Sequence, residues 1–128
     1  MGLQECHGVR LLVCSAEGPK LRRDRDALEL IGEAGAHRAG LVAVPVERFD
    51  PDFFHLKTRL AGEFLQKFVI YGVRVAIVGD LSAFLNQGHA LQAFVRESNR
   101  GHSLWFVSSL DDLKQRLQKD ADKSEQAR

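Results

Sequence analysis

Lys57 is the residue of this chain whose type and position point most directly to chemistry. In the helix predicted over residues 50–72, a projection at about 100° per residue places Lys57 in the middle of an apolar face. A lysine there either packs its aliphatic stem while its amine reaches solvent, or holds the amine at a cleft, where it meets an anion or a carboxylate. The first arrangement is the more common one, and we expect it for Lys57.

Asp80 and three serines should lie at the same end of the predicted sheet as Lys57. Asp80 follows the strand predicted over residues 73–78, and the serines follow this strand or the next one. Ligands of open α/β sheets bind outside the carboxyl ends of the strands. An aspartate after a strand is more often a turn or cap residue than a catalyst, so this is a weak candidate site. The candidate ligand-binding residues are Lys57, Asp80, Ser82 and Ser109, with Ser108 beside them.

The spacing of the other reactive residues predicts no metal, cofactor or catalytic residue. The five histidines and two cysteines show neither His-x-x-x-His nor Cys-x-x-Cys spacing, and no glycine-rich phosphate loop follows a strand. A hairpin turning at His7-Gly8 would place Cys6 and Cys14 too far apart for a disulfide, so we expect two free thiols. Free thiols are typical of a reducing cytoplasm.

Composition indicates one soluble domain. The chain has 128 residues, of which 45% are hydrophobic and 27% charged, and its formal net charge is +1. That charge gives no general attraction to nucleic acid or to an anionic membrane. There is no apolar run of about 18 residues and no apolar signal-peptide core, so we expect a cytoplasmic protein without a membrane partner.

Strands and helices alternate along the chain after a short hairpin. This order predicts an α/β fold with a mostly parallel sheet of four or five strands, an N-terminal hairpin and about four helices. We expect one domain over residues 1–119 and a disordered polar tail over residues 120–128. The predicted strands are Leu3–Cys6, Val9–Ser15, Leu41–Val44, Val73–Val78 and Leu104–Val107, the last four mutually parallel.

The longest periodic stretch, residues 50–72, predicts one continuous helix. Asp50 is a plausible N-cap and Gly72 a plausible stop. Gly62 in its middle costs about 1 kcal/mol against alanine. Either close packing of a neighbouring backbone or a partner surface would explain this glycine, and we expect the first. The predicted inner face consists of Phe53, Leu56, Leu60, Phe64, Phe68 and Tyr71.

Three segments carry a family resemblance. PDFFHLKTRLAGEFLQKFVIYGVRVAIVGD, then ESNRG, then FVSSLDDLKQRL resemble the bacterial domain-of-unknown-function family 4180. The match covers nearly the whole chain and is densest from Pro51 to Asp80. This family has no assigned biochemical role, so the resemblance implies no activity.

More distantly, the chain resembles the sulfate-transporter and anti-sigma-antagonist (STAS) domains, including the SpoIIAA-like proteins. That resemblance implies a single STAS-like domain and favours a binding protein over an enzyme, by analogy alone. In anti-sigma antagonists a phosphorylated Ser or Thr lies at the start of the helix after the third strand. Here that place reads ERFDPDFF, without a hydroxyl, and Thr58 lies about two turns inside the predicted helix. The phospho-switch therefore does not carry over.

The leading hypothesis is a non-enzymatic cytoplasmic binding or regulatory module that acts through a protein partner, with a homodimer left open and no nucleic-acid partner. The alternatives are a small-ligand binder and an enzyme, both using a strand-end pocket near Lys57 and Asp80. A flat surface at the strand ends would favour the partner module. A deep pocket holding Lys57 would favour a ligand or an enzyme.

Overall fold

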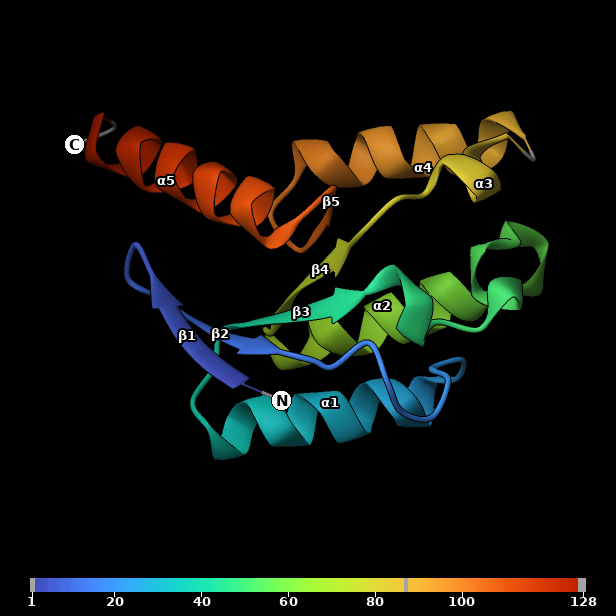
Figure 1. The fold of residues 1–128 in the computed structure, drawn as a ribbon, viewed down its shortest axis with the longest axis horizontal. Helices are drawn as coiled ribbons and strands as arrows, with labels where there is room; N and C mark the ends of the chain where they lie inside the picture. The colour runs from blue at the N-terminus through green and yellow to red at the C-terminus, as the bar shows by residue number, and fades with distance from the viewer. Residues whose placement is uncertain (1, 87, 127–128) are drawn as a thin grey trace.

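Five strands form one sheet, and they lie in it in the order of the sequence (Figure 1). The computed structural model describes residues 2–86 and 88–126. β1 pairs antiparallel with β2, and the other three pairings are parallel, as the strand–helix alternation predicted. The strands are β1 Gly2–Cys6, β2 Val9–Val13, β3 Leu41–Pro45, β4 Arg74–Val78 and β5 Leu104–Val107.

The β1–β2 hairpin turns at His7 and Gly8, as predicted. Both residues have positive φ angles, +50° and +83°, which is the backbone geometry of a two-residue hairpin turn. Cys6 pairs with Val9 at the start of β2, whereas Cys14 follows Val13 at the other end of that strand. Both thiols are free, which confirms the prediction.

Helices cover both faces of the sheet. α1 and α2 lie side by side on one face, where they pack on a large core cluster that also receives Leu91 of α4 (Figure 1). α5 covers the other face, where Leu113 and Leu117 pack on Trp105 and its neighbours. The helices are α1 Asp24–Ala36, α2 Leu60–Tyr71, α3 Ser82–Leu85, α4 His89–Arg100 and α5 Leu110–Gln126. No helix in these described ranges is long and apolar enough to cross a membrane.

The last helix begins after Ser109 and continues beyond Lys119. Ser109 Oγ accepts a hydrogen bond from the Asp112 amide at 3.1 Å, which is the N-cap interaction expected there. The helix runs to Gln126, so the predicted polar tail is helical from residue 120 to residue 126. Residues 127–128 of that tail lie outside the described residues.

The single helix predicted over residues 50–72 is wrong, because the segment divides into three pieces. Two short 3-10 helices, η2 Pro51–Phe54 and η3 Leu56–Thr58, precede α2. Arg59 between η3 and α2 has a left-handed backbone with φ +64°. The Thr58 hydroxyl donates to the carbonyls of His55 and Asp52, at 2.7 and 3.1 Å. These local bonds compete with the helical backbone pattern.

Aromatic packing overrides the helical period in this segment. Phe49 contacts Phe53, Phe54 and Phe64, with ring centroids 4.5, 5.9 and 5.6 Å apart. The break lets both consecutive phenylalanines enter the core, where Phe53 is 0% and Phe54 3% exposed. Such burial is worth more than a few helical hydrogen bonds on the surface.

The break also changes which residues of the segment face the core. Phe64 and Phe68 are buried as predicted, whereas Tyr71 is 60% exposed. Lys57 is exposed on η3, outside the apolar face on which the helical projection placed it. The expected close packing at Gly62 is absent, since an added Cβ would meet no atom within 4 Å.

Candidate functional site

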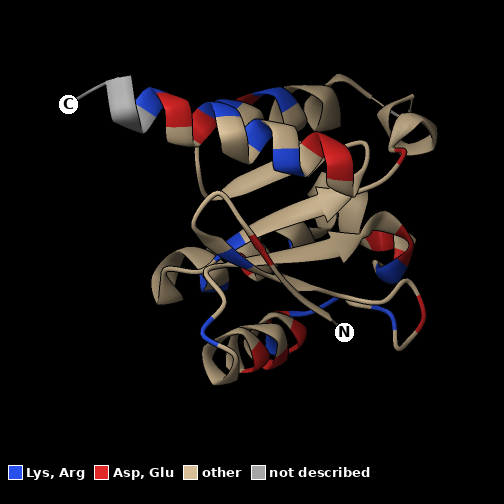
Figure 2. Cartoon of the chain, turned by 60° about the vertical axis from the view of Figure 1, so that its left-hand side comes forward, with Lys and Arg blue, Asp and Glu red and all other residues tan. Residues whose placement is uncertain are grey.

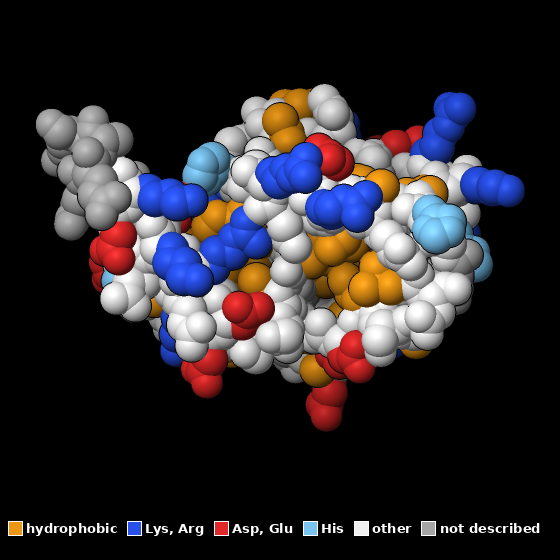
Figure 3. Space-filling model, turned by 90° about the horizontal axis from the view of Figure 1, so that it is seen from above, with side chains coloured by type: hydrophobic (Ala, Val, Ile, Leu, Met, Phe, Trp, Pro, Cys, Tyr) orange, Lys and Arg blue, Asp and Glu red, His pale blue; other side chains and the backbone are white. Residues whose placement is uncertain are grey.

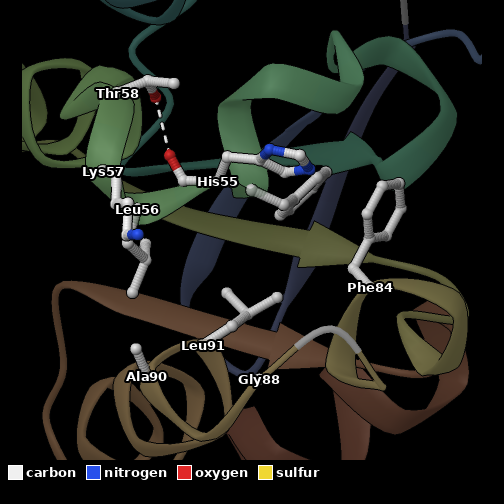
Figure 4. A pocket seen from close by; sticks show the side chains of 9 residues that line it. His55, Leu56, Lys57, Thr58, Phe84, Gly88, Ala90 and Leu91 are labelled. Carbon is white, nitrogen blue, oxygen red and sulfur yellow. Dashed lines mark hydrogen bonds between the residues drawn. The ribbon is translucent and has the colours of Figure 1, made fainter.

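A hollow of about 440 Å³ lies between the η2–η3 segment and the beginning of α4 (Figure 4). The segment follows β3 and α4 follows the β4 exit, so the hollow lies at the carboxyl end of the parallel strands. We call it the Lys57 hollow. It is lined by Phe54, His55, Leu56, Lys57, Thr58, Phe84, Gly88, Ala90 and Leu91.

The floor of the Lys57 hollow is apolar and built from three separate segments. Phe54 and Leu91 are 3% and 5% exposed, and both belong to the main core cluster. The Phe84 ring packs against Phe54 with centroids 4.5 Å apart. The floor is therefore continuous with the core, and a ligand there would exchange water for packed hydrocarbon.

The rim of the hollow carries the polar groups. Lys57 is exposed, and none of the ion pairs among the described residues involves it. Figure 4 shows the Thr58 hydroxyl turned back to the His55 carbonyl. The Thr58–His55 bond stabilises this loop. The backbone of Arg59 is left-handed, a conformation that costs a non-glycine residue about 1–3 kcal/mol. A cationic amine thus stands beside a preformed apolar floor.

Asp80 lines a second hollow, of about 360 Å³, where β4 and β5 end. Its Oδ1 accepts a hydrogen bond from the Ser82 amide at 2.8 Å. That backbone bond, together with one from the Ser82 side chain, lowers the pKa of the Asp80 carboxyl below its usual value. Asp80 is thus an ionised residue whose carboxylate accepts from the backbone amide two residues on, an Asx turn at the entry to α3, which is a common role for aspartate after a strand.

The predicted site residues separate into three groups. Lys57 lines the first hollow, and Asp80, Ser82 and Ser108 line the second. Ser109 lines neither of these two hollows and instead caps α5. All of them lie at the strand ends as expected, but the amine and the carboxylate do not share one pocket. An acid–base pair formed by Lys57 and Asp80 therefore has no geometric support.

The apolar floor is the part of the site that reasoning from sequence missed. Phe84 and Leu91 are not among the candidate residues that the sequence indicated. Phe54 did carry a signal, because two adjacent phenylalanines follow Pro51 in a region dense in aromatic residues. Their convergence on one hollow depends on tertiary packing.

The described part of the chain gives little support for a metal site or for a nucleophilic Cys14 thiol. Within residues 2–86 and 88–126 no group of three or more His, Cys, Asp or Glu side chains is placed to hold a metal ion. Burial raises the pKa of the Cys14 thiol above its ordinary value, which disfavours the nucleophilic thiolate.

Comparison with known proteins gives one match. The family model described as Domain of unknown function (DUF4180) matches residues 6–117. No curated protein and no solved structure matches the chain. The family model spans all five strands in whole or in part, both hollows and the first half of α5. The chain therefore belongs to the DUF4180 family.

Proposed function

We propose that this chain is a non-enzymatic, cytoplasmic binding and regulatory domain that acts through a protein partner. The partner inserts an apolar side chain with a neighbouring carboxylate into the Lys57 hollow. The observation that supports this most is the pairing of a preformed apolar floor with an exposed amine that has no described carboxylate partner.

The floor supplies most of the binding free energy in this proposal. Burying one leucine or phenylalanine side chain is worth about 1.5–3 kcal/mol. Interface hot spots have this character, since one large side chain fills a desolvated pocket and is surrounded by polar contacts. Phe54, Phe84 and Leu91 offer such a pocket.

The amine supplies selectivity. An exposed ion pair between Lys57 and a partner carboxylate adds only about 0.2–1 kcal/mol, but it fixes orientation and speeds encounter with an acidic segment. The STAS-like resemblance supports the same place by analogy, because the switch residue of anti-sigma antagonists lies at the start of the helix after the third strand. The Lys57 hollow borders that connection, between β3 and α2.

A second candidate function is binding of a small amphipathic carboxylate in the same hollow. Its volume of about 440 Å³ lies within the range of ligand sites, about 300–1,000 Å³, and the surface at this end of the sheet is not flat. The separation of Lys57 from Asp80 favours binding over acid–base catalysis for either candidate.

The test is capture from the native cytoplasm with a set of matched variants. Ala90→Trp fills the hollow without changing charge, and Ala83→Trp adds the same bulk on α3 outside it. Lys57→Glu reverses the rim charge, and Lys114→Glu does the same on α5. We expect one or more proteins to be captured by the unaltered chain and both controls, and to be lost with Ala90→Trp and Lys57→Glu.

The same preparation separates the two candidates. A non-covalent mass adduct on the freshly purified chain, absent from Ala90→Trp, would assign the hollow to a small ligand. Equal capture by all five proteins, with no adduct on any of them, would contradict both uses of the Lys57 hollow.

A further inference from the structure

A basic hollow of about 340 Å³ lies at the opposite, amino end of the parallel strands. It is formed by the end of α4, the turn before β5 and the middle of α5, and we call it the Trp105 hollow. Lys and Arg side chains gather over the α5 side of the molecule in Figure 3. The charged residues lining the hollow are Arg100, Arg116, Lys119, Asp120 and Lys123.

Two arginines are fixed against the indole of Trp105. The guanidinium carbons of Arg74 and Arg116 lie 4.4 and 4.3 Å from its ring centroid. Arg74 Nε also donates to the His102 carbonyl at 2.8 Å, and Arg116 donates to the Asn99 carbonyl. Cations held in this way lose little conformational freedom when an anion binds.

Three cationic side chains of this region take part in none of the described ion pairs. Asp120 lies 4.0 Å from Arg74 and 3.3 Å from His102, and Arg100 pairs with Glu97 at 3.0 Å. The described ion pairs include none for the remaining cations. These cations occupy positions i, i+3 and i+7 of α5, a spacing that places them on one side of the helix. They are Arg116, Lys119 and Lys123. Figure 2 shows basic and acidic positions recurring along this helix.

The two arginines beside Trp105 are partly buried, and their partners replace only part of the lost hydration. Arg74 Nη2 is buried and has no hydrogen-bond partner among the described groups. Burial lowers the pKa of Arg74 and of Arg116. The Asp120 charge opposes this at both arginines, and the Asp112 charge does so at Arg116, whereas the Arg74 charge lowers the pKa of Arg116 further. Arg116 lines the hollow, so an anion there would offset the lost hydration of Arg116 and its repulsion by Arg74.

We infer that the Trp105 hollow binds a small anion carrying at least two phosphate groups. Three cations that take part in none of the described ion pairs, in a chain of formal net charge +1, mark a local excess of positive charge that a monovalent anion would not match. Guanidinium and ammonium groups are the side chains that best donate to phosphate oxygens. This site is separate from the Lys57 hollow and goes beyond the proposed function.

Pyrophosphate is the probe, and binding is measured by calorimetry and by the fluorescence of Trp105, the one tryptophan of the chain. Sodium chloride keeps the ionic strength constant. We expect saturable binding, and binding at least about tenfold weaker in the double variant Lys119→Gln/Lys123→Gln. Lys114→Gln, on the same helix outside the hollow, is the matched control and should bind like the unaltered chain.

Three results would overturn the inference. The first is neither heat nor a fluorescence change beyond that of sodium chloride alone. The second is equal affinity of the double variant and the unaltered chain. The third is equal affinity for orthophosphate and pyrophosphate, which would remove the requirement for two phosphate groups.

Discussion

Lys57 and Asp80 line two different hollows at the carboxyl end of the sheet. Because the two charges do not share a pocket, removing one should not leave the other buried and unpaired. We predict that Lys57→Met leaves the free energy of unfolding unchanged within about 0.5 kcal/mol. Urea unfolding of both single variants and of Lys57→Met/Asp80→Asn should give additive effects, and coupling above about 1 kcal/mol would contradict the separation.

A second prediction concerns the stability of variants at Arg59, whose backbone is left-handed. Glycine adopts this conformation freely, whereas any L side chain there costs about 1–2 kcal/mol. Arg59→Gly should therefore be more stable than Arg59→Ala by about 1 kcal/mol. In one continuous helix the order would be reversed, since alanine is favoured over glycine by about 1 kcal/mol. Thermal or urea unfolding of this pair thus tests directly whether the helix is broken.

Two aromatic residues of the predicted inner face of residues 50–72 should differ sharply in their contribution to the free energy of unfolding. Phe64 is 0% exposed and packs on Phe53 and Phe68, so Phe64→Ala should cost about 3–5 kcal/mol. Tyr71 is 60% exposed at the end of α2, so Tyr71→Ala should cost under about 1 kcal/mol. If urea unfolding showed comparable losses of unfolding free energy for the two variants, the end of α2 would be packed in solution, which would contradict this prediction.

Cys14 should make stability depend on alkaline pH. Burial raises the pKa of its thiol in the folded chain above its ordinary value, with a smaller opposing effect of the Arg48 charge. The unfolded thiol then loses its proton first, so this stabilising contribution is complete below about pH 9 and is lost as the pH rises through the folded pKa.

Unfolding midpoints at about pH 8 and about pH 10 measure this effect. The drop between the two should be smaller in Cys14→Ala than in the unaltered chain. Cys6→Ala serves as the control, because Cys6 is only half-buried in β1. An equal drop in all three proteins would remove Cys14 as the source.

The fold could be predicted from sequence where burial alone decides the structure. The segments VRVAIV and LWFV are short apolar runs, and both β4 and β5 are parallel strands packed on two sides. The segment from Asp50 could not be predicted in the same way. Its helical period is genuine, but the Thr58 hydroxyl bonds and the paired burial of Phe53 and Phe54 decide its backbone. Periodicity contains no information on either.

For the candidate site, too, the sequence predicted the part that topology decides and missed the part that tertiary packing decides. The sequence placed Lys57 and Asp80 at the carboxyl end of the sheet, because parallel topology decides which strand ends meet. Their separation into two hollows depends on Phe84 and Leu91, which close the floor beside Lys57 from α3 and α4. Contacts between segments so far apart in sequence follow only from the packed structure.

The most direct test of the proposed docking surface is hydrogen–deuterium exchange of the chain with its captured partner bound. The account predicts slower amide exchange over residues 54–58 and 88–91, the two segments that face each other across the Lys57 hollow. Protection confined to the exposed end of α2, at Val69–Tyr71, or to α5, with unchanged exchange around Lys57, would contradict it.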